Sequence, residues 1–152
     1  MYTIEEFDKA KTAILKYVIY KKRTEQEIEI KFKPSIEENL LEDVIQELKQ
    51  IGYISDEQYV ERAIAEYKQL RALSLKEIIY KLRSKGIKQE TIDNYWEQQE
   101  EDDLLEYEKQ SAQKIARKKK EKDKIEIQQM LKKKGYREES IKKAIEELEE
   151  GE

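Results

Sequence analysis

The sequence contains no cysteine and no histidine among its 152 residues. Without cysteine there can be no disulfide framework, thiol nucleophile or zinc–thiolate centre. Without histidine there can be no Ser-His-Asp triad and no imidazole that binds a metal or shuttles protons. With four glycines and one proline, the chain also lacks a glycine-rich loop that could cradle phosphates. We therefore expect no catalytic residues, no metal site, no cofactor and no enzymatic activity.

Long apolar runs are absent as well. No stretch approaches the roughly 18–20 apolar residues that a membrane span requires. The first six residues, MYTIEE, have neither the basic nor the apolar segment of a signal peptide. We therefore expect a cytoplasmic protein that does not contact a membrane.

The composition favours an extended helical fold. Charged residues make up 43% and hydrophobic residues 38% of the chain, with a net charge of −4. A low apolar share suits amphipathic helices that each bury one stripe better than it suits a single compact core. Scarce glycine and proline leave little turn chemistry for strands. Apolar residues recur at helical spacing over residues 75–82 and 141–148, so we predict an all-α protein.

A repeat is visible in the helix start signals. A capping box is a polar N-cap residue followed three positions later by Glu or Gln. Three such boxes, separated by 50 and 49 residues, begin at Thr24, Ser74 and Asp123. Four and eight positions after each cap stand large apolar residues: Ile28 and Phe32, Ile78 and Leu82, Ile127 and Leu131. This regularity predicts three copies of one helical unit.

Helix ends support the same repeat. Lys-Gly pairs at 85–86 and 134–135 fit a helix C-terminus that ends in the left-handed conformation, whereas the first unit has Pro34-Ser35 there. One further helix precedes each box, over roughly 4–21, 56–71 and 101–120, and another follows it. We predict three tandem three-helix repeats, 1–54, 55–100 and 101–152, that form an elongated, curved molecule.

Two predictions concern packing. Tyr80, Tyr95 and Trp96 lie at helical spacing and are expected to pack between helices. The Gly52-Tyr53-Ile54 step should link the first two units, with Ile54 and Tyr59 buried beside Leu48. A run of acidic residues at 100–103, with Glu106, could hold a metal ion, but acidic side chains are favoured at any helix start. We favour a solvated helix N-terminus there.

Charge is strongly polarised in the third unit. Residues 109–137 carry twelve basic and three acidic side chains, while residues 97–108 carry seven acidic and no basic ones. Such a segment can meet DNA phosphates or an acidic protein surface, or it can be a solvated face. The candidate partner-binding residues are Lys114, Arg117, Lys118, Lys132 and Lys133, with a second set on the middle unit at Arg71, Lys76, Lys81 and Arg83.

Several short motifs, taken in order, resemble a known family. They are AILKY at 13–17, RTEQEI at 23–28, LKQIGYISDEQY at 48–59, IIYKLRSKGI at 78–87 and KKKGY at 132–136. The chain resembles the RecX family, regulators of the bacterial recombinase RecA, over roughly residues 10–148. Ser55 stands where family members commonly have Asp.

The resemblance implies a non-enzymatic regulator in homologous recombination, DNA repair and the SOS response. It would bind the RecA–DNA filament and inhibit or modulate ATP hydrolysis, strand exchange and repressor cleavage. The expected partners are the RecA filament and single- or double-stranded DNA, reached through the basic third repeat, and the chain is expected to be a monomer. Two alternatives stay open: a helix-turn-helix-like DNA-binding regulator, and a helical scaffold that binds proteins only.

Overall fold

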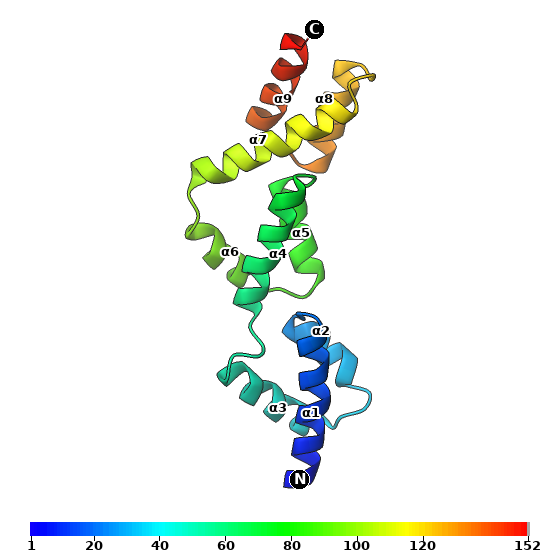
Figure 1. The fold of residues 1–152 in the computed structure, drawn as a ribbon, viewed down its shortest axis with the longest axis vertical. Helices are drawn as coiled ribbons and strands as arrows, with labels where there is room; N and C mark the ends of the chain where they lie inside the picture. Colours follow the sequence, from blue (N-terminus) through cyan, green and yellow to red (C-terminus); the bar gives the residue numbers. More distant parts are fainter. Residues whose placement is uncertain (152) are drawn as a thin grey trace.

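The computed structural model describes residues 1–151, and in this part of the chain the protein consists of helices and connecting turns with no strand. The predicted all-α class is confirmed. The molecule is elongated, with its two termini at opposite ends (Figure 1). The helices are α1 (Ile4–Tyr20), α2 (Glu25–Phe32), α3 (Glu38–Gln50), α4 (Asp56–Leu70), α5 (Leu75–Ser84), α6 (Gln89–Glu97), α7 (Glu101–Lys118), α8 (Lys124–Lys134) and α9 (Glu138–Glu150).

The predicted capping boxes form at two of the three positions. At Thr24 and Ser74 the hydroxyl accepts the amide of the third helical residue, whose Glu side chain accepts the N-cap amide in return. Asp123 departs from this pattern, because its carboxylate accepts the amide of Ile125 instead. The prediction of a third capping box is therefore wrong, although α8 does begin there.

The helices surround three hydrophobic clusters. The buried residues of the first come from α1–α3 and Ile54, those of the second from α4–α6 with the start of α7, and those of the third from α7–α9. The residues four and eight positions after each predicted cap are all buried. Because Leu104 and Tyr107 of α7 belong to the second cluster, that helix joins two units. The division at 54/55 and 100/101 stays a prediction.

The aromatic predictions need correction. Tyr80 is 75% exposed, since it follows the buried Ile78 by two positions and so points away from the apolar stripe of α5. Tyr95 and Trp96 are half-buried against the second cluster. Ile54 is buried with Leu48 as predicted, but Tyr59 is half-buried and packs on the second cluster, toward which the apolar face of α4 points.

Successive units meet through the same contact twice. The N-cap hydroxyl of α2, on Thr24, donates to the carbonyl of Lys85 at the end of α5 across 2.7 Å. The N-cap hydroxyl of α5, on Ser74, donates to the carbonyl of Lys134 at the end of α8, also across 2.7 Å. Each hydroxyl thus caps its own helix and holds the next unit. The middle helices α2, α5 and α8 consequently follow one another along one side of the molecule (Figure 1).

Two glycines allow this close approach. Gly86 and Gly135 have φ of +89° and +94°. A Cβ on Gly86 would lie 2.5 Å from the Cβ of Gln26, and one on Gly135 would lie 2.9 Å from the Cβ of Lys76. The first unit has Pro34-Ser35 where the other two have Lys-Gly.

Candidate partner interface

Basic side chains gather at the C-terminal ends of the three middle helices. The last turns carry Lys31 in α2, Lys81 and Arg83 in α5, and Lys132, Lys133 and Lys134 in α8. Positive charge is favourable there because it offsets the negative end of the helix dipole. Most of these side chains are exposed, so their charge also faces solvent. Each of the three units therefore contributes basic groups from the last turn of its middle helix.

The junction between the second and third units brings together three candidates from different repeats. Lys132 and Lys133 are exposed at the end of α8. Lys76, the second residue of α5, lies against Gly135, directly after that basic turn. Lys76 therefore adds a cation from the middle unit to the basic end of the third.

Lys81 and Arg83 form a separate group at the opposite end of α5. Both are exposed, and Arg83 Nη1 lies 3.5 Å from the Ile87 carbonyl oxygen. This end of α5 faces the first unit, where Lys85 Nζ lies 4.0 Å from Glu27 Oε2.

The remaining candidates lie along α7 and at the end of α4. Lys114 is half-buried and donates from Nζ to the carbonyl of Leu70 across 2.7 Å, beside the exposed Arg71. Arg117 Nη1 bonds Glu147 Oε1 at 3.1 Å, and Lys118 is exposed. Lys114 therefore connects α7 to α4. The nine candidates thus form three groups, and which of them bind a partner stays a prediction.

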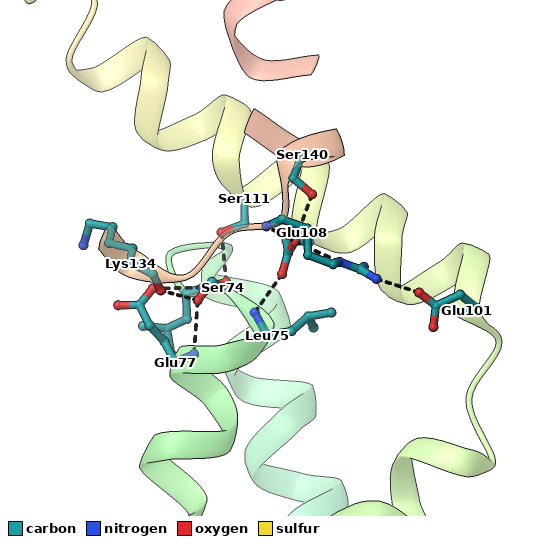
Figure 2. Close-up of polar contacts among 10 residues, drawn as sticks. Ser74, Leu75, Glu77, Glu101, Glu108, Ser111, Lys134 and Ser140 are labelled. Carbon is teal, nitrogen blue, oxygen red and sulfur yellow. Dashed lines mark hydrogen bonds and ion pairs between the residues drawn. The ribbon is translucent and has the colours of Figure 1, made fainter. Parts of the chain in front are cut away.

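The main polar network of the molecule centres on Glu108, which the sequence reasoning counted only as one acid among many. Its side chain is 1% exposed. Its carboxylate accepts the Leu75 amide at 3.1 Å, the Arg137 amide at 3.0 Å, Arg137 Nε at 3.2 Å and Ser140 Oγ at 3.0 Å (Figure 2). One residue of α7 therefore holds the starts of both α5 and α9.

Arg137 completes this network at its exposed edge. Its Nη1 lies 2.6 Å from Glu101 Oε1. Partial burial lowers the pKa of Arg137, but hydrogen bonds to Glu101 and Glu108 outweigh it and raise the pKa overall. Glu101 of the acidic run thus takes part in an ion pair. Within residues 1–151 no group of three or more acidic side chains is placed to hold a metal ion.

Three hydroxyl groups, on Tyr107, Ser111 and Tyr136, extend the polar contacts between the second and third units. Tyr107 Oη and Ser111 Oγ both donate to the carbonyl of Leu73, at 2.7 and 3.1 Å, and Ser111 Oγ lies 2.6 Å from Tyr136 Oη. Burial raises the pKa of the Tyr136 phenol far above its ordinary value. A signal was present in the sequence: Glu108 and Ser111 share helical spacing with the apolar Leu104 and Ala112, which indicates buried polar residues.

Within residues 1–151, no helix has the length and apolar character that crossing a membrane demands.

Comparison with solved structures confirms the resemblance to RecX. The crystal structure of RecX from Lactobacillus salivarius matches with a TM-score of 0.78 and 24% sequence identity, covering 97% of this chain and 99% of that one. A crystal structure of the regulatory protein RecX matches with a TM-score of 0.74 and 25% identity, covering 90% of this chain and 71% of that one. No protein-family model matches the chain, and no curated protein is significantly similar to it in sequence.

Proposed function

We propose, from the fold that this chain shares with RecX over nearly its whole length, that the protein is a non-enzymatic regulator of the RecA recombinase. In this proposal it binds the RecA–DNA filament in the cytoplasm and lowers ATP hydrolysis, strand exchange and the stimulated cleavage of repressor. The observation that carries the proposal is the structural match to RecX from Lactobacillus salivarius, which covers 97% of this chain and 99% of that one.

The shape of the molecule supports this function. The chain is elongated, and its middle helices follow one another along it (Figure 1), each with basic residues in its last turn. A helical filament likewise presents one surface at regular intervals. Several weak contacts made by one elongated molecule strengthen one another, because the first raises the effective concentration of the next.

The chemistry of the side chains supports action by binding. The chain has no cysteine or histidine. Its most buried polar side chains, Glu108, Ser111 and Ser74, are engaged in hydrogen bonds that hold the units together. Regulation would then come from occupying a surface of the filament.

The basic groups are the proposed contacts. The best placed are Lys132 and Lys133 with Lys76, because they are exposed and come together from two units. Exposed cations attract DNA phosphates or an acidic protein surface, and both attractions weaken as salt screens them. Phosphate contacts give the steeper salt dependence because binding releases condensed counterions.

The test is co-sedimentation with RecA filaments formed on single-stranded DNA. The wild-type chain should pellet with the filament, and the double reversal Lys132→Glu/Lys133→Glu should pellet less. The matched control is Lys9→Glu/Lys16→Glu, which makes the same charge change at two exposed residues of α1, outside the basic last turns of the middle helices. The control should pellet as the wild type does.

Other outcomes separate the alternatives. Sequence-dependent binding to duplex DNA in the absence of RecA would favour a DNA-binding regulator. Binding to RecA that does not change between low and high salt, and that both double reversals leave intact, would favour a protein-only scaffold. If the chain stays in the supernatant with filaments in low salt, the proposed function is wrong.

A further inference from the structure

The two junctions between units repeat the same design but differ in strength. At the second junction, hydrogen bonds connect Ser74 to α8, Lys114 to the last turn of α4, and both Tyr107 and Ser111 to Leu73. Glu108, which is 1% exposed, adds one more across the junction, from the Leu75 amide, and accepts three others within the third unit, from Arg137 and Ser140. Figure 2 shows Leu75, at the start of α5, and Ser140, at the start of α9, turned toward Glu108 of α7.

The first junction has counterparts of two of these hydrogen bonds, those of Ser74 and Leu75, and few other contacts. Thr24 Oγ donates to the Lys85 carbonyl at 2.7 Å, and the Glu25 amide donates to Asp56 Oδ1 at 3.0 Å. Asp56 occupies the role that Glu108 has at the second junction, since each accepts one backbone amide of the neighbouring unit, but the first junction has no counterpart of the bonds from Lys114, Tyr107 and Ser111 among the hydrogen bonds described. The ion pair between Lys85 and Glu27 spans 4.0 Å and is partly exposed, so it adds little.

Apolar packing shows the same asymmetry. Leu104 and Tyr107 of α7 are buried in the second cluster, so α7 carries apolar contacts across the second junction. Among the described residues, the buried members of the first cluster lie between Ala10 and Ile54, and those of the second begin at Val60. The connection from α3 to α4 passes through the exposed Ile51, Gly52 and Tyr53 and then through Ile54, which is buried in the first cluster and contributes nothing to the second.

We infer that the molecule has a hinge at the Ile54–Ser55 step, about which the first unit moves while residues 56–151 act as one rigid body. A junction without shared apolar residues and with few hydrogen bonds opens at low free-energy cost. A junction that would lose five hydrogen bonds and its shared apolar contacts does not, because unpaired buried groups are costly. This inference concerns the chain alone and does not depend on the proposed function.

The test is pulsed electron–electron spin resonance on pairs of nitroxide labels. Because the chain has no cysteine, two introduced cysteines are the labelling sites. Lys16→Cys with Glu90→Cys spans the first junction, and Glu90→Cys with Lys143→Cys spans the second. Lys16→Cys with Glu42→Cys lies within the first unit and gives the width that label motion alone produces. All four positions are exposed on helices.

The inference predicts a distance distribution across the first junction that is wider than that of the reference pair. Across the second junction the width should equal that of the reference. Adding Glu108→Gln to the second pair should widen its distribution, since the network at α7 is what fixes that junction. Equal widths across both junctions, or a wider distribution across the second, would overturn the inference. If circular dichroism shows that a labelled chain has lost helix, Lys9→Cys with Glu97→Cys replaces the first pair.

Discussion

Replacement of Gly86 by alanine tests the repeating junction directly. Gly86 has φ of +89°, which costs an L-residue roughly 1–2 kcal/mol. The added methyl group would also lie 2.5 Å from the Cβ of Gln26, which cannot rotate away because it is attached to the backbone of α2. Overpacking of this kind costs about 1–3 kcal/mol. Gly86→Ala should therefore destabilise the closed form of the first junction by about 2–5 kcal/mol, and the protein as a whole by as much of this as opening the junction does not relieve.

Gly52 supplies a matched control within the same chain. Its φ is also +89°, but a Cβ there would meet nothing within 4 Å. Gly52→Ala should therefore cost only the conformational part, roughly 1–2 kcal/mol. Gly135→Ala, whose methyl group would lie 2.9 Å from the Cβ of Lys76, should fall between the two. Denaturation with urea, followed by circular dichroism, measures all three. Equal losses for Gly86→Ala and Gly52→Ala would refute the claim that Gly86 is needed for contact between units.

Three further predictions follow from the buried polar groups. Glu108→Ala should destabilise the protein by about 3 kcal/mol in urea, because it leaves buried donors without a partner, whereas Glu106→Ala on the exposed side of α7 should change stability by less than about 0.5 kcal/mol. Tyr136→Phe should cost about 1 kcal/mol by the same assay, since Ser111 loses its phenol partner. Burial raises the pKa of Tyr59 to about 12, so the stability it contributes is complete below pH 10 and is lost as the pH rises toward 12. Tyr59→Phe should therefore make the melting temperature fall less steeply over that range than it does in the wild type.

The helices and their order could be predicted because they depend on local signals. N-cap residues such as Thr24 and Ser74, and the isoleucines four positions later, mark each middle helix within a few residues. The exposure of an individual side chain was harder to predict than the position of its helix. Tyr80 is aromatic and lies in an apolar-rich helix, yet it points outward because the stripe of α5 passes through Leu75, Ile78 and Leu82.

Contacts between units could not be predicted, since they depend on residues far apart in the sequence. Glu108 of the third unit lies 33 residues from Leu75 of the second, and composition alone assigned Glu108 to an acidic segment. Lys114 was assigned to a binding surface for the same reason, although it bonds a carbonyl 44 residues away.

The proposed function is tested most directly by the rate of ATP hydrolysis by RecA on single-stranded DNA. With RecA and DNA fixed and this protein added in excess, we predict that the steady-state rate falls. The Lys132→Glu/Lys133→Glu variant should require more protein for the same effect, and the Lys9→Glu/Lys16→Glu control should act as the wild type does. An ATP hydrolysis rate that does not change under excess wild-type protein, in low salt, would contradict the proposal that this chain regulates RecA.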